Sequence, residues 1–267
     1  MKQGLQVDLG LIGYAEAYAL QKRIVAARKT DAIADVLLLC EHPHVITQGR
    51  NGKREHLLAS EHVLRQKSVE FYETSRGGDI TYHGPGQIVG YPILNLGAIR
   101  RDVVWYVRML EEAMIRATAE FGITAGREPG KTGVWVEIAE DGSSLAAHPA
   151  VAGHSFSPSA IREGPLATSE KLGAIGVHIS RWVTSHGFAY NVSTDLRLFD
   201  LIVPCGIADR KATSLEKLLG RTVQETEVGP RIAEHLGELF SLEMKETSKK
   251  DLLQKLEHIE ESVTVSA

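Results

Sequence analysis

Cys205 is the residue best placed to act as a nucleophile. It stands between Pro204 and Gly206, so a rigid and a permissive residue flank the thiol in what we expect to be a turn. The alternative is a small buried hydrophobic residue, because free cysteine is among the most buried residue types. Cys40 ends the aliphatic run 36–40, and we assign it to the core. From the residues alone, both interpretations of Cys205 stay open.

Lys171 is a second candidate, at the start of an apolar run over residues 172–177 that is rich in small side chains. A lysine at a strand end is often only a solvated charge. Beside a thiol, however, its ammonium group stabilises the thiolate and lowers the pKa of the cysteine. The position therefore becomes chemically significant only if the fold brings it to a cysteine.

Residues 76–87 form the most unusual stretch of the chain, with four glycines and the polar side chains of Arg76, Tyr82 and His83. Glycines let the backbone approach a ligand closely and point N–H groups at it. The spacing does not match a dinucleotide-binding fingerprint, and no Gly-Lys-Ser/Thr sequence ends this stretch as it would end a phosphate-binding loop. A long glycine-rich turn between two strands is the structural alternative. The three polar side chains favour a binding surface.

The 11 histidines raise the question of a metal site. His42 and His44 are two residues apart, and His178 and His186 flank an expected turn. The chain has no His-Glu-x-x-His pattern and no Cys-x-x-Cys pair. We therefore predict no metal site, and the two cysteines are also too few for a disulfide framework.

The elements that must position these residues follow from hydrophobic periodicity. Apolar runs and alternation predict strands at 5–11, 36–40, 44–46, 69–72, 88–96, 132–138, 174–179 and 188–192. Apolar spacings of three and four predict helices at 14–27, 107–121, 232–240 and 252–263. Strands dominate the middle of the chain without a regular βαβ rhythm. We therefore predict an α+β fold with a mixed or antiparallel sheet, not a doubly wound one.

The length and composition of the chain limit how many domains it can contain. With 267 residues it suits one large domain. Residues 139–170 contain three prolines, three glycines and six serines without sustained periodicity, which predicts a long loop insertion. We divide the chain into a main domain over residues 1–243, with the insertion at 139–170, and a helical tail over residues 244–267.

The charge balance and the apolar runs exclude several classes of protein. The 30 Lys and Arg residues against 34 Asp and Glu residues give a net charge of −4, which argues against a nucleic-acid protein driven by backbone electrostatics. No apolar run reaches the roughly 18 residues of a membrane-spanning helix, and the N-terminus lacks a signal-peptide pattern. We expect a soluble protein of a reducing compartment that binds neither nucleic acid nor membrane.

Five motifs occur in order along the chain, at residues 76–87, 132–136, 171–177, 185–192 and 202–207. Their order and content resemble the octanoyltransferases, or lipoyl(octanoyl) transferases, of lipoate biosynthesis, over residues 5–240. The resemblance implies a single α+β domain similar to the biotin and lipoate protein ligases, with a mixed sheet around an acyl tunnel. The insertion at 139–170 is much longer than the short turn usual there.

The resemblance also implies a role for individual residues. The cysteine that carries the acyl thioester falls on Cys205, and the family's lysine falls on Lys171. The substrate-contacting residues fall on Arg76, Gly77, Gly78, Asp79, Ile80, Thr81, Tyr82, His83, Ala174, Ile175, Gly176, Gly187, Phe188 and Ala189. The implied reaction moves an octanoyl group from acyl carrier protein to a lysine of the lipoyl domains of 2-oxoacid dehydrogenases and of the glycine cleavage H protein. It takes place in the cytoplasm and needs no cofactor.

These residue types fit that chemistry. A thioester donor is already activated, so transfer needs a nucleophile, a way to form its anion and donors for the oxyanion, but neither metal nor ATP. Burying about six methylenes of the acyl chain contributes about 5 kcal/mol, at roughly 0.8 kcal/mol each. Gly77, Gly78 and Gly176 would wall the slot for the chain.

Because acyl carrier proteins are acidic, we also expect a local basic patch that steers docking. The basic residues considered for it are Arg50, Lys53, Arg54, Arg100 and Arg101.

Two other functions stay open at this point. A lipoate protein ligase would share the fold but activate free lipoate with ATP. A non-catalytic module that binds carrier proteins would require neither Cys205 nor Lys171. The thiol between proline and glycine, together with the lysine, favours the transferase, and an ATP requirement or an acyl adduct would discriminate among the three.

Overall fold

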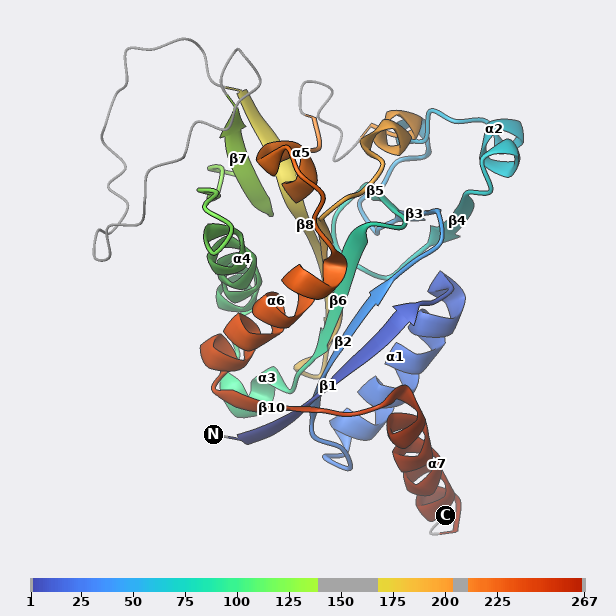
Figure 1. The fold of residues 1–267 in the computed structure, drawn as a ribbon. Helices are drawn as coiled ribbons and strands as arrows, with labels where there is room; N and C mark the ends of the chain where they lie inside the picture. The colour runs from blue at the N-terminus through green and yellow to red at the C-terminus, as the bar shows by residue number, and fades with distance from the viewer. Residues whose placement is uncertain (1, 139–167, 204–210, 266–267) are drawn as a thin grey trace.

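The computed structural model describes residues 2–138, 168–203 and 211–265, which are coloured in Figure 1. Cys205 and all but the last three residues of the predicted insertion at 139–170 lie outside the described residues. Those last three residues belong to a strand that begins at Thr168, so the chain enters the sheet earlier than expected. No helix in the described ranges has the length and apolar character needed to cross a membrane.

A seven-stranded mixed sheet forms the centre of the molecule (Figure 1). Its strands, in spatial order, are β10 (Leu242–Glu246), β1 (Lys2–Leu11), β2 (Asp35–Glu41), β6 (Gln87–Ile93), β9 (Val183–Asn191), β8 (Thr168–Ser180) and β7 (Val134–Ile138). β1 pairs in parallel with β10 and β2, and the other neighbours pair antiparallel. The predicted α+β fold with a mixed sheet is confirmed.

Helices cover both faces of this sheet (Figure 1). The helices on one face are α4 (Val103–Ala119) and α6 (Glu225–Phe240), and those on the other are α1 (Tyr14–Lys29) and α7 (Lys249–Val265). Successive strand residues point to opposite faces. Leu37 and Leu39 of β2 therefore join the core under α4 and α6, whereas Leu38 and Cys40 join the core under α1 and α7.

A second, three-stranded sheet has its own small core. Its strands are β4 (Glu70–Glu73), β3 (Val45–Gln48) and β5 (Ile80–His83), in that spatial order. The helix α2 (Glu61–Gln66) and the 3-10 helix η2 (Leu196–Leu201) complete this core. The remaining short helices are η1 (Arg54–His56), α3 (Leu96–Ile99) and α5 (Leu215–Leu219). β5 lies inside the glycine-rich stretch. The glycines on either side of it interrupt the hydrophobic alternation from which a strand would be predicted.

All the predicted strands and helices are found, with ends that differ by a few residues. The C-terminal tail, residues 244–267, differs more from what the sequence predicts. The boundary expected between residues 243 and 244 falls inside β10, which pairs with β1. Leu252 and Leu256 of α7 are fully buried against α1 and β1. The tail is therefore packed into the α1–α7 core, because its apolar stripe needs a surface to cover.

Candidate active site

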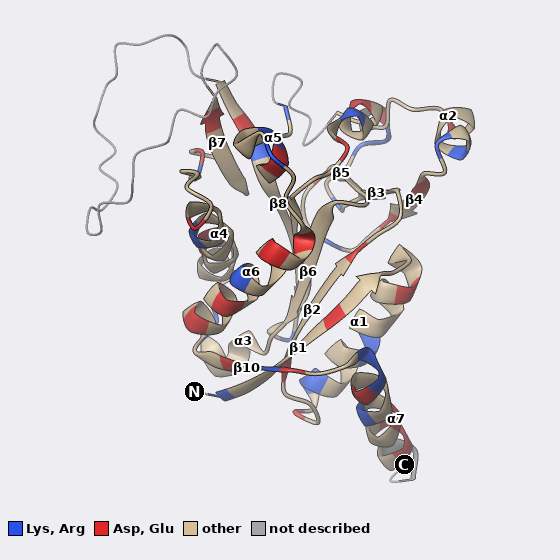
Figure 2. Cartoon of the chain, viewed as in Figure 1, with Lys and Arg blue, Asp and Glu red and all other residues tan. Residues whose placement is uncertain are grey.

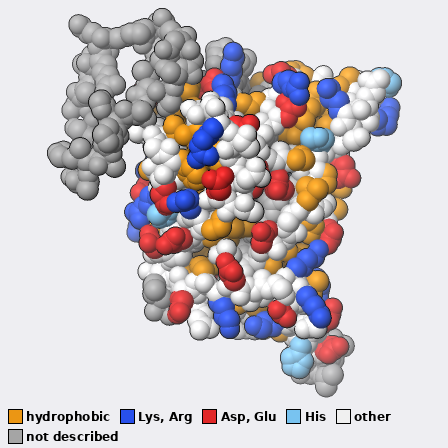
Figure 3. Space-filling model, viewed as in Figure 1, with side chains coloured by type: hydrophobic (Ala, Val, Ile, Leu, Met, Phe, Trp, Pro, Cys, Tyr) orange, Lys and Arg blue, Asp and Glu red, His pale blue; other side chains and the backbone are white. Residues whose placement is uncertain are grey.

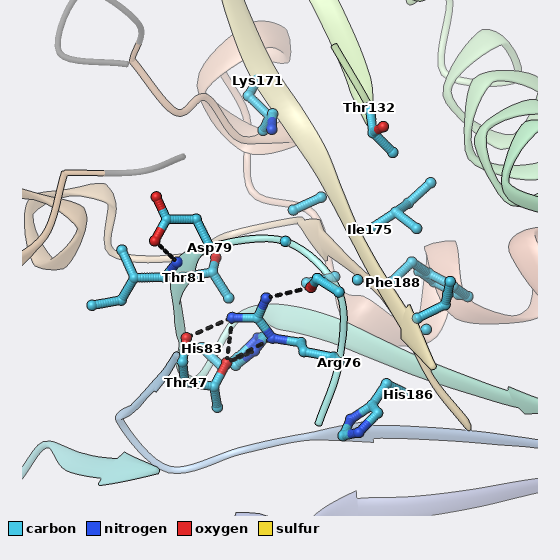
Figure 4. A pocket seen from close by; sticks show the side chains of 18 of the residues that line it. Thr47, Arg76, Asp79, Thr81, His83, Thr132, Lys171, Ile175, His186 and Phe188 are labelled. Carbon is cyan, nitrogen blue, oxygen red and sulfur yellow. Dashed lines mark hydrogen bonds between the residues drawn. The ribbon is translucent and has the colours of Figure 1, made fainter. Parts of the chain in front are cut away.

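A cavity of about 590 Å³ lies along the glycine-rich stretch, β8 and β9. It is lined by Lys171 and by all the residues predicted to bind substrate except Tyr82. Figure 4 shows Lys171 at one end and Arg76, His83 and His186 at the other. We call these the Lys171 end and the Arg76 end. Small-ligand sites typically occupy roughly 300–1,000 Å³, so the cavity has the size of a ligand site.

Two of the predicted segments meet in the wall of this cavity. Residues 174–176 of β8 pair antiparallel with residues 187–189 of β9, residue for residue. Gly176 is needed here because a Cβ would lie 3.0 Å from the Gly77 carbonyl oxygen. The Gly77 N–H in turn donates to the Val177 carbonyl oxygen at 2.8 Å. The glycine-rich stretch therefore closes against β8 through backbone contacts.

Arg76 is only 8% exposed, and its guanidinium is held by Thr47 and by the local backbone. Nη2 donates to the Thr47 carbonyl oxygen at 2.5 Å and to the Thr47 hydroxyl at 3.0 Å, and Nη1 donates to the Gly77 carbonyl oxygen at 3.1 Å. Figure 4 shows these bonds as dashed lines. The positive charge of Arg76 is therefore fixed at its end of the cavity.

His83 belongs to a hydrogen-bonded chain that defines its tautomer. Its Nδ1 lies 2.7 Å from Oε1 of Gln87, and Nε2 of Gln87 donates to Oδ1 of Asn191 at 2.9 Å. Because Gln87 Oε1 only accepts, the proton of His83 is on Nδ1, and Nε2 accepts from the Thr47 hydroxyl at 3.3 Å. Burial, followed by the nearby His42, lowers the pKa of His83 to about 3. His83 is therefore a neutral hydrogen-bonding residue.

His186 is the second buried histidine at the Arg76 end. Its Nε2 lies 3.1 Å from Ser75 Oγ, and its ring stacks on Tyr18 with the centroids 5.3 Å apart. Burial lowers the pKa of His186 to about 3, and the charge of Arg76 acts in the same direction. A general base works best with a pKa near the operating pH, so this end of the cavity offers no such base from its two histidines.

Tyr82 corrects one prediction, because its side chain does not line the cavity. Alternate residues of β5 point to opposite faces. Thr81 and His83 share the face that lines the cavity, and Ile80, at the start of β5, also reaches it. The Tyr82 ring instead packs edge-on against Phe199 in the small core, with the centroids 5.3 Å apart. Its hydroxyl lies 2.8 Å from Nδ1 of His44, and burial raises its pKa. Tyr82 supports the site from behind.

Lys171 stands at the other end, where β8 meets β7. Its Nζ lies 4.6 Å from the centroid of the Trp135 ring, which is a cation–π distance. Its Cε lies 3.4 Å from where a Cβ of Gly133 would be. Its N–H donates to the Lys211 carbonyl oxygen, and its carbonyl oxygen accepts from the Thr213 N–H, both at 2.9 Å. The backbone and the side chain of Lys171 are therefore both supported.

Glu111 of α4 is a supporting residue that the sequence analysis missed. Its carboxylate is fully buried and accepts from the Gly133 N–H at 3.0 Å, from Arg127 Nε at 2.9 Å and from Arg108 Nη1 at 2.6 Å. Gly133 has a φ of +119°, so few other residues could adopt this turn. Glu111 thus fixes the turn on which Lys171 rests. The available signal was an acidic residue on the apolar side of a predicted helix.

The histidines considered as metal ligands have other partners. Nδ1 of His42 donates to the Ile12 carbonyl oxygen at 2.7 Å, and Nε2 accepts from the Tyr91 hydroxyl at 2.7 Å. Nδ1 of His178 accepts from Arg50 Nη2 at 3.0 Å. Within residues 2–138, 168–203 and 211–265, no three His, Cys, Asp or Glu side chains are grouped so that they could hold a metal ion.

The assembled site can be compared with known proteins. Residues 13–237 match the family model of the lipoyl protein ligase A/B catalytic domain. The chain belongs to this family. The matched range contains the glycine-rich stretch, β8 and β9, so it includes every described residue of the predicted site.

Curated relatives narrow the position within the family. The octanoyltransferase of Solibacter usitatus is 48% identical over 89% of this chain and 93% of the relative. Those of Acidobacterium capsulatum and Cytophaga hutchinsonii are 49% and 43% identical, over 79% and 92% of this chain and 78% and 96% of theirs. The resemblance to the octanoyltransferases is confirmed.

Solved structures share the fold at low sequence identity. A bipartite lipoate protein ligase from Thermoplasma acidophilum has a TM-score of 0.67 at 13% identity, covering 97% of this chain and 92% of its own. Lipoate-protein ligase A bound with ATP has a TM-score of 0.63 at 11% identity, covering 97% and 93%. These likenesses show the fold alone, and it is the lipoate protein ligase fold that was predicted.

Proposed function

We propose that this protein transfers an octanoyl group from an acyl carrier protein to a lysine of a lipoyl domain, through a thioester on Cys205. The acceptors are the lipoyl domains of 2-oxoacid dehydrogenases and of the glycine cleavage H protein, and the reaction takes place in the cytoplasm. The observation that carries the proposal is the single cavity that joins the predicted binding segments and ends at Lys171. Relatives that are 40% to 49% identical and named octanoyltransferases support it.

The described chain on either side of Cys205 is anchored near this cavity. Two residues before it, the Val203 N–H donates to the His56 carbonyl oxygen at 2.8 Å, and the His56 ring lies 2.6 Å from a carboxylate of the cavity wall. Six residues after it, Lys211 lines the cavity and pairs with Lys171. These two anchors support Cys205 as the nucleophile that works with Lys171.

In the first half-reaction, the Cys205 thiolate attacks the carbonyl carbon of the donor thioester, and the bond from that carbon to the carrier's sulfur breaks. The Lys171 ammonium stabilises the Cys205 thiolate beforehand and then gives its proton to the departing thiolate. The Trp135 ring lies within cation–π distance of the Lys171 ammonium and positions it without adding a competing charge. The products are an octanoyl thioester on the enzyme, a carrier thiol and a neutral lysine.

In the second half-reaction, the acceptor amine attacks the Cys205 thioester, an amide bond forms and the carbon–sulfur bond breaks. Neutral Lys171 takes the proton that the attacking nitrogen must lose, which restores the ammonium and thiolate pair. The donor thioester supplies the free energy for both steps. This sequence predicts a covalent intermediate and ping-pong kinetics.

The proposal is tested by transfer in the absence of nucleotide. Purified protein mixed with octanoyl acyl carrier protein should gain one octanoyl group in its intact mass, with the adduct on Cys205. Addition of a lipoyl domain without ATP should remove it. Cys205→Ser should abolish the adduct, because a hydroxyl is a much weaker nucleophile near neutral pH. Cys40→Ser, a control in the α1–α7 core, should keep most of the activity.

Two results would contradict this proposal. An adduct that maps to Cys40 would show that the nucleophile is misassigned. Transfer that requires ATP and free lipoate would show that the chain is a ligase instead.

A further inference from the structure

Three basic side chains gather where β8 runs away from the cavity, and we call Lys29, Arg50 and Arg181 the basic strip. Arg50 Nη2 donates to Nδ1 of His178 at 3.0 Å, and Lys29 Nζ donates to the Ser180 hydroxyl at 3.0 Å. His178 and Ser180 are two residues apart on β8, so they share a face of the strand. Arg181 follows directly in the turn. Arg50 and Lys29 therefore bind side chains on one face of β8, and the charge of Arg181 acts on Lys29 beside them.

Within the part of the chain that the structure describes, no carboxylate pairs with the basic strip. Among the residues that the structure describes, none of its three members forms an ion pair. Two other members of the basic patch expected from the sequence are paired, Lys53 with Glu55 at 3.5 Å and Arg100 with Asp102 at 2.9 Å. Of the basic patch expected from the sequence, we therefore keep Arg50 as a member of the basic strip.

The field along the basic strip is positive. Burial and then Arg181 lower the pKa of Lys29, and burial followed by Arg50 and Lys29 lowers the pKa of His178. Among the described residues, the charges that shift these two groups are those of Arg181, Arg50 and Lys29, all cations. The molecule as a whole has a net charge of −4, and acidic and basic side chains intermix on the face seen in Figure 3 and along α6 and α7 in Figure 2. The basic strip is therefore a local exception.

We propose that the basic strip docks the acidic carrier protein that donates the octanoyl group, an inference that rests on the proposed function. The near end of the basic strip, at His178, is seven residues beyond Lys171 on β8, which is about 23 Å at a rise of about 3.3 Å per residue, and Arg181 is three residues further. A carrier protein presents its acyl group on a long flexible arm, so it can dock at that distance from the reacting atoms. A lipoyl domain must bring its own lysine, whose side chain is far too short.

The experiment compares two donors that differ in the carrier alone. A triple variant neutralises the basic strip with substitutions that keep the local structure. Lys29→Gln retains a donor for Ser180, Arg50→Gln retains a donor for His178, and Arg181→Asn suits the φ of +52° at that position. The donors are octanoyl acyl carrier protein and octanoyl-pantetheine, which lacks the acidic protein.

For the triple variant we expect the KM for octanoyl acyl carrier protein to rise about tenfold at low ionic strength, with kcat little changed. The salt dependence of that KM should become shallower. Rates with octanoyl-pantetheine and the KM for the lipoyl domain should match those of the unmodified protein. Arg221→Gln, a matched control on an exposed arginine between α5 and α6, should leave every constant unchanged.

Three results would overturn the inference: an unchanged KM for the carrier protein, an increase confined to the KM for the lipoyl domain, or an equal loss with octanoyl-pantetheine. The second of these would mean that the acceptor docks on the basic strip. Failure of the proposed function itself looks different, because the unmodified protein would then transfer from neither donor.

Discussion

At the Arg76 end of the cavity, His83 and His186 are buried and hydrogen bonded, whereas at the opposite end Lys171 is half-buried and rests against Trp135. The two histidines have pKa values of about 3 because burial and neighbouring positive charge disfavour their protonated forms. Both ends therefore contain basic residues, but in different environments.

The two ends of the cavity therefore differ in whether a residue there can transfer a proton. A neutral histidine with both ring nitrogens committed, as in His83, contributes shape and hydrogen bonds rather than a proton. Lys171 is only half-buried, so a group carried by another protein could reach it. Under the proposed function, the cavity wall binds the acyl chain and the chemistry takes place at the Lys171 end.

The largest effect should come from Lys171. Arginine keeps the positive charge but cannot deprotonate in a protein, so Lys171→Arg should form the acyl-enzyme and pass the group on poorly. Lys171→Ala should be slow in both steps. A general acid–base group contributes roughly 10²–10⁴-fold, and we expect a loss of that size, measured by rapid quench of each half-reaction.

A Lys171→Arg variant that completed both half-reactions at the wild-type rate would show that Lys171 is not the proton acceptor. The proton acceptor would then have to be a residue other than Lys171, and His83, with a pKa of about 3, is poorly suited to that role.

Glu111→Gln should have the next largest effect, because it leaves Arg108 and Arg127 without their buried carboxylate. We expect a loss of about 2 kcal/mol in the free energy of unfolding from the weakened charge-assisted hydrogen bonds, measured with urea. We also expect kcat to fall more than KM rises, since the Gly133 turn supports Lys171. Such a result would show that Lys171 depends on the hydrogen bond between Glu111 and the Gly133 turn.

Glu112→Gln is the matched control for this test. Glu112 is adjacent, also binds Arg127, and is 27% exposed. Exposed ion pairs contribute about 0–1 kcal/mol, so this variant should be nearly neutral. Equal losses for the two variants would remove any special role of Glu111.

Gly176→Ala tests the cavity wall. Its methyl group would lie 3.0 Å from the Gly77 carbonyl oxygen and from Arg76 Cδ, so the glycine-rich stretch must move away from β8. Overpacking costs typically about 1–3 kcal/mol, and we expect about 2 kcal/mol together with a higher KM for the acyl donor. Gly126→Ala, where a Cβ meets nothing within 4 Å, is the control. A normal KM for Gly176→Ala would place the acyl chain elsewhere.

The smallest effect is the pH dependence of stability. The folded-state pKa values of His83 and His186 are about 3, below the unfolded value near 6.5, so the unfolded chain binds protons first as the pH falls. Their stabilising contribution is complete above about pH 6.5 and is lost as the pH falls toward 3. We expect about 1 kcal/mol per histidine between pH 7 and pH 5.5, measured by urea unfolding. His186→Gln should make this dependence shallower, and an unaltered slope would contradict the buried, neutral assignment.

The elements that periodicity could identify are those whose own residues specify them. The spacing of apolar residues predicts α4 and the alternation in β1 predicts a half-buried strand, because each pattern records which face is buried. β5 and β10 were missed because glycines flank β5, β10 is mostly charged, and both strands are held by pairing with another segment of the chain.

At the candidate site, the sequence specifies which residue types are present and in what order they occur along the chain. That was enough to name Cys205 and Lys171, the glycine-rich stretch and the family to which they point. Only the folded chain shows that Tyr82 faces away from the cavity, that Glu111 supports the Gly133 turn and that Lys29 and Arg50 meet the same face of β8. These facts depend on strand register and on contacts between residues far apart in the chain, and local sequence patterns carry no record of either.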